Sequence, residues 1–348
     1  MNILKKLMSF IIVFILLLHT TQYNAYATPS ATKNPVKIGV FLLDPNELFL
    51  FRFKENLENI QKENENKVQF TFFDSKRNQG TQNDDIIKAL NENFDLFILQ
   101  PVTFKIEELK DIFNMIVQKN IPLILLTSPN RQLSNFVKGY PKTIIIGGDD
   151  EQSGILQGEL LANVWNTNKK TIDHNKDNII QYIMLKGPAN DPATTSRSKY
   201  SIQTLNESGI KTQELSSNFC NWDKTCAKDA ISSLYLRYND KIELIIASND
   251  EMAIGAIEAL QNYGYNKGDN SKHIPIVGIG GLPEAKELIK QGSMAGTILQ
   301  DPRDYANAVY TVGMNLVSGT NPLNATNYKF DDTGNTIRIP YYPYTNLH

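Results

Sequence analysis

Residues 37–42 read KIGVFL, a nearly unbroken apolar run. A run without polar alternation is typical of a strand that is buried on both faces of a parallel sheet. From about residue 48 to residue 64 the apolar residues recur at helical spacing, and residues 68–73 form the next short apolar run. The segment therefore predicts the first strand of a βαβ unit.

The same alternation continues along the chain. Further strands are predicted at residues 96–99, 122–126, 143–146, 179–185, 244–247, 274–279 and 295–299. Further helices are predicted at residues 82–91, 106–119, 151–165, 193–207, 251–263 and 283–291. Residues 128–140, rich in Pro, Asn and Ser, are expected to be a looser segment. The repeated units predict an α/β fold of two doubly wound parallel-sheet lobes and not one barrel.

The composition is that of an ordinary soluble globular chain. The 348 residues are 41% hydrophobic and 21% charged, and 35 basic against 37 acidic side chains leave a net charge of −2. This balance offers no electrostatic attraction for nucleic acid. Two cysteines cannot form a disulfide scaffold or a four-thiolate zinc site.

Residues 1–27 are expected to lie outside the fold. Two lysines precede an apolar run at residues 7–18, and AYA at residues 25–27 has the small-x-small pattern of a signal-peptidase site. A membrane span normally needs ~20 apolar residues, so the segment is interpreted as a signal peptide, with a short uncleaved anchor as the alternative. The protein is therefore expected in the periplasm or on the outer face of the cytoplasmic membrane. Because the first cysteine is Cys220, no lipid is expected at a lipoprotein cleavage site.

The predicted strand ends carry no recognisable catalytic pattern. GIGG at residues 278–281 follows a strand but lacks the third spaced glycine of a dinucleotide fingerprint,. The four histidines are spread over the signal, the C-terminus and two polar loops, which argues against a catalytic triad,. The sequence therefore favours a binding protein over an enzyme.

Polar and aromatic residues suited to a sugar collect where the strands end. Aromatic rings hold the C–H faces of a sugar, while carboxylates, amides and guanidinium groups hold its hydroxyls. The candidates are Glu47, Phe49, Gln100, Asp191, Arg197, Trp222, Asn249 and Gln300. Taken singly, each has a structural interpretation: Phe49 as core, Trp222 as a loop anchor and Asn249 as a helix N-cap.

Longer motifs point to a known family. They are QND at residues 82–84, SGILQG at 153–158, LKG at 185–187, ASNDEMA at 247–253 and LPEA at 282–285. With them the chain resembles, nearly end to end, the periplasmic galactose/glucose-binding proteins of the type I sugar-binding family. The resemblance implies two lobes, joined by three crossings, that close like a hinge over one sugar. It implies a first lobe at residues 36–126 plus 302–330 and a second at residues 128–299 plus 331–348.

The resemblance also assigns roles to the candidates. Phe49 and Trp222 take the positions of the stacking pair, Arg197 that of the sugar-binding arginine and Asn249 that of the strand-end asparagine. Several other positions depart from the galactose/glucose pattern. Glu47 stands where the family has aspartate, Gln100 and Gln300 where it has asparagine, Asp191 where it has histidine, and Ala193 and Gly280 where it has aspartate.

These departures predict a change of sugar specificity. In the family, the positions of Gln100 and Asp191 face the exocyclic CH2OH of the sugar, and the longer side chains of Glu47 and Gln100 would fill that end of the pocket. Ala193 and Gly280 act in the opposite direction, because they remove carboxylates and open space. A site built for a hydroxyl rejects ligands that leave its polar groups unpaired. The hypothesis is a pentose such as xylose, in preference to galactose or glucose.

The resemblance implies a second site, for a structural calcium ion. Residues 173–181 place side-chain oxygens at positions 1, 3, 5 and 9 of a calcium-type loop, and position 7 can use its backbone carbonyl,. Asn178 stands at the sharp turn, where asparagine tolerates the left-handed conformation. Without the family match, such a cluster is more often a solvated turn. The implied ligands are Asp173, Asn175, Asp177, Ile179, Gln181 and, from a distant segment, Glu243.

Two functions are compatible with these features. In the first, the protein is the receptor of an ABC sugar importer and delivers its ligand to a membrane permease. In the second, it is a sugar sensor that docks on the extracytoplasmic domain of a histidine kinase, as in clostridial relatives that pair with LytS-type kinases and sense xylose. The missing lipoprotein cysteine favours the sensor in a Gram-positive organism, whereas the importer leads in a Gram-negative periplasm. A sugar-responsive repressor is disfavoured, because an export signal occupies the place of a DNA-binding headpiece.

Cys220 and Cys226 bracket Trp222 in the sequence. Outside the cytoplasm they can form a disulfide that stiffens the loop of the stacking ring. Two free thiols are equally compatible with the sequence, because disulfide geometry is not readable from spacing.

Overall fold

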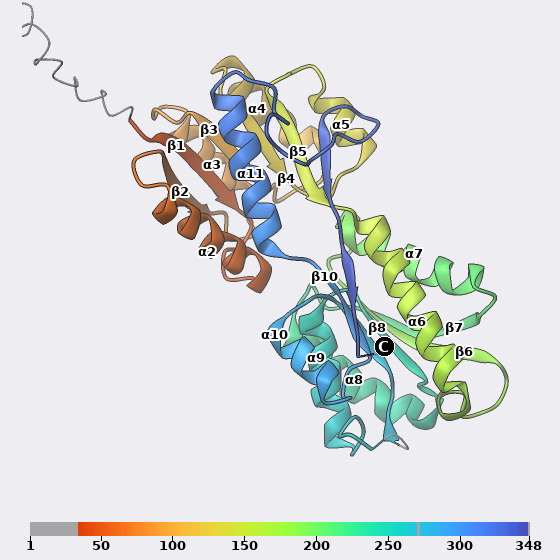
Figure 1. The fold of residues 1–348 in the computed structure, drawn as a ribbon. Helices are drawn as coiled ribbons and strands as arrows, with labels where there is room; N and C mark the ends of the chain where they lie inside the picture. Colours follow the sequence, from red (N-terminus) through yellow and green to blue (C-terminus); the bar gives the residue numbers. More distant parts are fainter. Residues whose placement is uncertain (1–33, 270–271, 347–348) are drawn as a thin grey trace, which may run out of the picture.

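The computed structural model describes residues 34–269 and 272–346. These residues form two α/β lobes that meet at a narrow waist, as Figure 1 shows. The predicted signal at residues 1–27 lies outside the described residues. Within the part of the chain that the structure describes, no helix is both long and apolar enough to span a bilayer.

The first lobe is built on a six-stranded parallel sheet. Its strands are β1 (Val36–Leu42), β2 (Val68–Asp74), β3 (Leu96–Leu99), β4 (Leu123–Leu126), β5 (Thr143–Gly148) and β11 (Thr336–Ile339). Its helices are α2 (Leu48–Glu63), α3 (Gln79–Ala89), α4 (Ile106–Gln118), α5 (Arg131–Val137) and α11 (Pro302–Val317). The strand order is β11-β5-β4-β3-β1-β2. Helices α2 and α11 cover one face, and α3, α4 and α5 cover the other.

The second lobe has the same layered construction. Its strands are β6 (Ile179–Lys186), β7 (Lys211–Phe219), β8 (Leu244–Ala247), β9 (Ile276–Gly280), β10 (Gly296–Leu299) and β12 (Tyr342–Tyr344). Its helices are α6 (Asp150–Ile172), α7 (Pro192–Glu207), α8 (Lys224–Tyr238), α9 (Asp250–Asn262), α10 (Pro283–Lys290) and the 3-10 helix η1 (Asn239–Lys241). The order is β12-β10-β9-β8-β6-β7, and β12 alone is antiparallel to its neighbour among the described strands. Helices α6 and α7 cover one face, and α8, α9 and α10 cover the other.

The apolar runs become strands because both faces of each sheet are covered. In β1 the residues Ile38, Val40 and Leu42 are completely buried, and β1 pairs in parallel with β2 and β3. Most helices then begin at an Asp or Asn that follows a strand and accepts a hydrogen bond from a backbone N–H of the first turn. These caps are Asn78, Asn130, Asp149, Asp191, Asp223, Asn249 and Asp301. The caps therefore place polar side chains beyond the carboxyl ends of the strands, where parallel sheets bind ligands.

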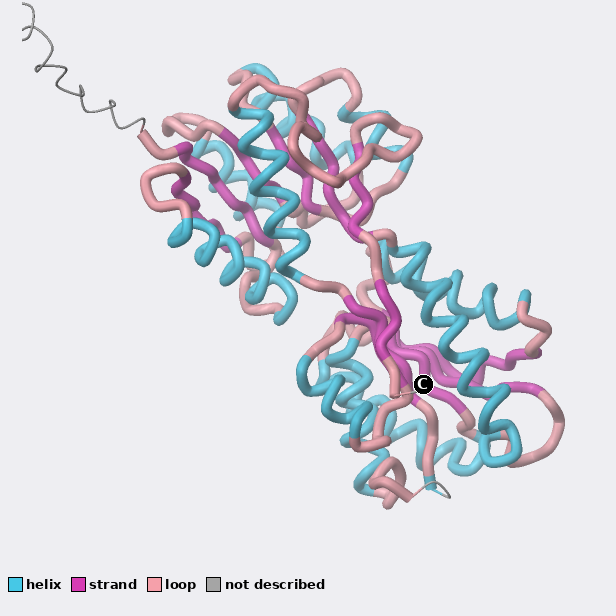
Figure 2. Tube along the Cα trace, in the orientation of Figure 1, coloured by secondary structure: helices cyan, strands magenta, loops and turns pink. Residues whose placement is uncertain are grey.

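The predicted fold class, two doubly wound parallel-sheet lobes joined by three crossings, is confirmed. The chain passes between the lobes after β5, after β10 and after β11, and Figure 2 shows these connections running through the waist. The crossings are residue 149, residues 300–301 and residues 340–341.

The predicted lobe boundaries are wrong at the first and third crossings. Residues 128–148 belong to the first lobe, because β5 pairs with β4 and α5 packs on the same sheet. Strand β11 also belongs to the first lobe, because it pairs with β5. An apolar run reveals a strand but not the sheet that it joins, since pairing is decided by contacts between distant segments. The second crossing lies where the sequence predicted it.

Candidate functional site

A cleft between the lobes brings together all eight candidate sugar-binding residues. The cavity has a volume of about 360 Å³ and lies beyond the carboxyl ends of strands from both sheets. The first lobe, the second lobe and the second crossing all contribute to its lining. The candidates in the lining are Glu47, Phe49, Gln100, Asp191, Arg197, Trp222, Asn249 and Gln300. Their contact with a ligand stays a prediction.

The first-lobe wall is fixed by hydrogen bonds to the backbone. Glu47 caps α2 and accepts a hydrogen bond from the N–H of Phe49 at 3.2 Å. Burial raises the pKa of the Glu47 carboxyl. The amide oxygen of Gln100 accepts from the N–H of Leu43 at 3.0 Å. The ring of Phe49 meets that of Tyr305 edge to face at 5.1 Å between centroids. These contacts hold the longer side chains of Glu47 and Gln100 in the wall.

In the second-lobe wall, two candidates are also helix caps. Asp191 caps α7 and accepts from the N–H of Ala193 at 2.8 Å. Asn249 caps α9 through the N–H of Met252 at 2.9 Å, and its amide group donates to the carbonyl of Trp222 at 3.1 Å. Asn249 is therefore both the N-cap of α9 and a residue of the cleft wall.

Trp222 reaches the cleft from a strained turn. Asn221 and Trp222 have φ angles of +52° and +69°, in the left-handed region that costs a bulky residue free energy,. The indole packs on Gly187, where any Cβ atom would overlap the ring. The guanidinium of Arg197 is a further neighbour, and its Cζ lies 5.6 Å from the centroid of the ring. The turn is thus held in an unusual conformation that presents an aromatic face to the cleft.

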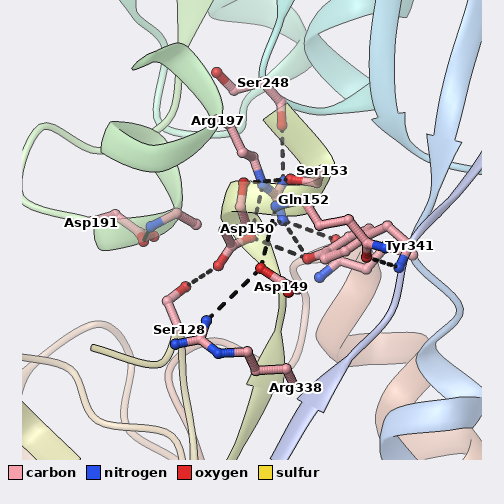
Figure 3. Close-up of polar contacts among 12 residues, drawn as sticks. Ser128, Asp149, Asp150, Gln152, Ser153, Asp191, Arg197, Ser248, Arg338 and Tyr341 are labelled. Atoms are coloured by element: carbon pink, nitrogen blue, oxygen red, sulfur yellow. Dashed lines mark hydrogen bonds and ion pairs between the residues drawn. The ribbon is translucent and has the colours of Figure 1, made fainter. Parts of the chain in front are cut away.

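Arg197 is the best-anchored candidate, and only 5% of its surface is exposed. Its Nε donates to Oδ1 of Asp150 at 3.0 Å, and one terminal nitrogen donates to the carbonyl of Ser248 at 2.9 Å. The other terminal nitrogen donates to the hydroxyl of Tyr341 at 3.0 Å and to the amide oxygen of Gln300 at 3.4 Å. Figure 3 shows Asp150, Ser248 and Tyr341 around the guanidinium. The sequence predicted the arginine but not this set of partners.

Asp150, Tyr305 and Tyr341 line the same cavity and were not among the sequence candidates. The position of Asp150, directly after a strand end, is a signal that could have revealed it. Tyr305 lies inside α11 and Tyr341 on the third crossing, so no local pattern marks either one. Burial is the main cause that raises the pKa of both tyrosine hydroxyls.

Two positions where the galactose/glucose pattern has aspartate lie beside other carboxylates. Gly280 has a φ of +151°, which disfavours any side chain, and a Cβ atom there would lie 3.1 Å from Oδ2 of Asp250. The Asp250 carboxylate accepts from the Thr297 hydroxyl at 2.6 Å and from the N–H of Leu282 at 2.8 Å. Ala193 is buried and donates its N–H to Asp191. The departure at Gly280 is therefore built into the backbone, whereas that at Ala193 lies in the side chain alone.

Three carboxyl groups of the second-lobe wall have raised pKa values. Burial raises the pKa of Asp191 to about 6 and that of Asp250 to about 6. The pKa of Glu251 rises to about 7, first through burial and then through the negative charge of Glu47 on the opposite lobe. The described lining of the cavity contains no histidine or cysteine. The arrangement is suited to hydrogen bonding with hydroxyl groups.

The six predicted calcium ligands converge at the loop between α6 and β6. Asp173 accepts from the N–H groups of Asp177 and Asn178 at 3.1 and 3.2 Å, and Asp177 also accepts from the amide of Gln181 at 2.8 Å. The Glu243 carboxylate arrives from the segment before β8 and accepts from the N–H of Gln181 at 3.0 Å. Asn178 has a φ of +61°, as the turn requires.

The oxygen atoms around this loop belong to carboxylate, amide and backbone carbonyl groups. Among the described residues, no three His, Cys, Asp or Glu side chains form a metal-binding group by themselves. An ion at the loop would therefore also need amide oxygens, from Asn175 and Gln181, and the carbonyl of Ile179. Such a combination of carboxylate, amide and carbonyl oxygens is the kind that Ca²⁺ accepts.

The two cysteines are free thiols in this structure. Cys220 is buried, and its pKa is raised to about 12 by burial and by the neighbouring Cys226 thiol. The Cys226 N–H donates to the carboxylate of Asp223, the cap of α8. Both flank the turn that carries Trp222.

Comparisons with known proteins agree with this architecture. Residues 38–321 match the family described as periplasmic binding protein domain. The chain is 31% identical over 314 residues to the D-galactose/methyl-galactoside binding periplasmic protein MglB of Haemophilus influenzae, with 89% of each chain covered. It is 24% identical over 291 residues to the xylitol-binding protein of Mycolicibacterium smegmatis, with 83% of this chain and 74% of that protein covered.

A solved structure extends the likeness to three dimensions. An ABC transporter solute binding protein from Bacillus halodurans with bound myo-inositol superposes with a TM-score of 0.71 and 23% identity, covering 90% of this chain and 95% of that one. At this identity the likeness shows the fold alone.

Two parallel-sheet lobes joined by three crossings around one cleft define the class of hinged, two-lobed binding proteins. The chain belongs to the periplasmic binding protein family, and the type I sugar-binding resemblance of its motifs is confirmed. Members of this family bind their ligand without converting it and act outside the cytoplasm. The protein is therefore an extracytoplasmic solute-binding protein and not an enzyme.

Proposed function

We propose that this protein is the monosaccharide receptor of an ABC importer and delivers its sugar to a membrane permease. The observation that carries the proposal is that Phe49 and Trp222 line one cavity from opposite lobes, with the amides of Gln100 and Asn249 in the same lining. Two aromatic rings and a polar rim suit the C–H faces and hydroxyls of a sugar. A ligand that contacts both lobes favours the closed state.

The relatives support this ligand class. The Haemophilus influenzae protein is named for galactose and methyl-galactoside, and the Mycolicibacterium smegmatis protein for xylitol. The Bacillus halodurans structure holds myo-inositol. All of these ligands are small, uncharged and rich in hydroxyl groups, which agrees with the near-neutral net charge of this chain.

We infer further that the sugar is a pentose such as xylose. The side chains of Glu47 and Gln100 are anchored to the backbone of the first lobe, so their extra methylene groups occupy the wall of the cavity. The φ of Gly280 disfavours the aspartate of the galactose/glucose pattern at that position. Both observations support a ligand other than galactose or glucose.

Calorimetric titration of the purified protein with xylose, arabinose, glucose and galactose tests the ligand. We expect xylose to bind at least about tenfold more tightly than glucose, because polar groups left unpaired by a wrong sugar cost free energy. Trp222→Ala should lose binding. Phe219→Ala is the control and should keep sugar binding, because it removes an aromatic residue that is 52% exposed and does not line the cavity. Tight glucose binding contradicts the pentose assignment.

The extracytoplasmic domain of a histidine kinase is the second candidate partner, which the missing lipoprotein cysteine favours in a Gram-positive organism. A kinase domain that recognises the closed lobes would use the same hinge as a permease. Purified protein with and without sugar can be mixed with the extracytoplasmic domain of a kinase encoded beside its gene. Sugar-dependent binding, with normal sugar uptake in a strain that lacks this protein, would favour the sensor over the importer.

We also propose that the loop at residues 173–181, with Glu243, binds a structural calcium ion. The hydrogen bonds that Asp173, Asp177 and Glu243 accept from the backbone hold several oxygens around one loop before any ion arrives. An ion that binds only the folded state stabilises it by mass action. The melting temperature should therefore rise with Ca²⁺ and fall with a chelator. Asp177→Ala should melt below the wild type even in chelator, because it loses the hydrogen bonds from Ile179 and Gln181, and its melting temperature should not respond to calcium. If the wild-type melting temperature is the same with calcium and with chelator, the loop is not a calcium site.

A further inference from the structure

The guanidinium of Arg197 contacts residues at all three crossings between the lobes. Asp150 directly follows the first crossing at residue 149, Gln300 lies on the second and Tyr341 on the third. Each one hydrogen-bonds to Arg197, at distances from 2.9 to 3.4 Å. These three residues, Arg197 and Ser128 are called the hinge cluster. Figure 3 shows Asp150 between Ser128, Arg197 and Tyr341.

Asp150 connects the two lobes as well as the crossings. Its Oδ2 accepts from the hydroxyl of Ser128, in the first lobe, at 2.7 Å. Its Oδ1 accepts from Arg197 of the second lobe and from the hydroxyl of Tyr341 at 3.1 Å. Both charged groups are about 95% buried, with exposures of 6% and 5%. A buried pair of this kind holds its geometry strictly, because each charge is costly without its partner.

The backbone leaves room for this cluster. A Cβ atom at Gly148, the last residue of β5, would overlap the hydroxyl groups of Tyr341 and Tyr305. Tyr305 is itself in contact with Tyr341 at 3.3 Å and with the amide of Gln300 at 3.2 Å. The glycine thus allows two tyrosines from different segments to reach the first crossing.

We propose that Asp150 is a positioning residue that couples the binding arginine to the hinge. Any rotation of the lobes changes the backbone torsion angles at the crossings. The side chains of Asp150, Gln300 and Tyr341, which lie at those crossings, all hydrogen-bond to Arg197. The position of the guanidinium is therefore set by the angle between the lobes, and a ligand held by Arg197 favours one angle. This inference rests on the proposed function, since it assigns to Asp150 a role in that same site.

The variants are Asp150→Asn and Tyr341→Phe, with Asp149→Asn as the matched control. Asp149 is the adjacent residue, caps α6 through the N–H of Gln152, and does not line the cavity. Asparagine caps a helix as well as aspartate does, so the control removes the same charge without touching Arg197. Sugar titration, and small-angle scattering of the sugar-free protein, are measured on each.

We expect Asp150→Asn to weaken sugar binding at least about tenfold, in line with the loss of a charged hydrogen-bond partner. The sugar-free variant should also have a larger radius of gyration, because the link between Ser128 and Arg197 is weakened. Arg197→Met should give the same enlargement, and the double variant no more than either single one. Tyr341→Phe should change both readouts in the same direction, and Asp149→Asn neither.

Wild-type affinity and an unchanged radius of gyration in Asp150→Asn would overturn the proposal. So would a lowered melting temperature with unchanged affinity, which indicates a purely structural role. If Asp150→Asn does not fold, Tyr341→Phe decides by the same criteria. If the wild type binds no sugar, the proposed function fails, while the scattering of the sugar-free variants still decides whether Asp150 ties the hinge.

Discussion

Asn249 accepts a hydrogen bond from Met252, donates one to the carbonyl of Trp222 and lines the cleft. A residue that looks like an ordinary helix cap in the sequence therefore also supports a binding wall. Glu47 and Asp191 combine the same two roles. The reason is geometric, because a helix that follows a parallel strand starts at the edge where ligands bind.

Gly187→Ala tests how far the position of Trp222 depends on its neighbour. The new methyl group would overlap the indole and the hydroxyl of Thr194, so the ring must move. We expect sugar affinity to fall about tenfold or more, because stacking depends on the placement of the ring, and the near-ultraviolet circular dichroism to change. Gly139→Ala is the control, since a Cβ atom there meets no atom within 4 Å. Equal affinities for the two variants would contradict the account.

At the scale of elements, the apolar runs predicted most strands and helices within a few residues. β3 and β8 have the predicted bounds, and α2 ends one residue earlier than predicted. The pattern missed the helices α5, α8 and α11 and the strands β7, β11 and β12. Helix α5 lies in the segment expected to be loose, and β7 is an edge strand with no fully buried residue. A strand at an edge does not need an apolar run, because one of its sides has no neighbouring strand.

Asn249→Ala should affect an element and the site together. Loss of the α9 cap should lower stability by about 1 kcal/mol, and loss of the bond to Trp222 should weaken sugar binding. Asn78→Ala removes the cap of α3, which does not line the cavity, and is the matched control. Urea unfolding and calorimetric titration of both variants measure the two effects. A similar loss of affinity in Asn78→Ala would show that the effect is not local.

At the scale of the whole molecule, the cleft concentrates acidic groups from opposite lobes. Glu251 of α9 and Glu47 of the first lobe both line the cavity, and the second contributes to the raised pKa of the first. A carboxyl group whose pKa is raised on folding binds more protons in the native state than in the unfolded state. Its contribution to stability is therefore present at low pH and is lost as the pH rises through the native pKa.

For Glu251 the pKa rises from 4.5 to about 7, so the loss should fall between about pH 4.5 and 7,. Glu251→Gln should melt ~2–4 °C above the wild type at pH 8 and close to it at pH 4.5. Glu258→Gln, on the same helix, is the control, and its change in stability at pH 8 should have the opposite sign. Lys224 and Lys228 lower the pKa of Glu258, so that variant should be less stable than the wild type at pH 8. The prediction is refuted if the melting temperatures of Glu251→Gln and the wild type differ by the same amount at pH 8 and at pH 4.5.

From the sequence alone followed the α/β class, most element positions, the family and the eight candidates that meet in the cleft. These depend on local periodicity and on motifs that fold at strand ends. The partners of Arg197 did not follow from it, because Asp150, Gln300 and Tyr341 are separated by up to 191 residues and meet only at the crossings. Nor did the sheet membership of β5 and β11, since pairing between distant segments is decided by the packed core. Local chemistry determined which residues could bind a ligand, and only the tertiary structure decided how those residues are joined to the hinge.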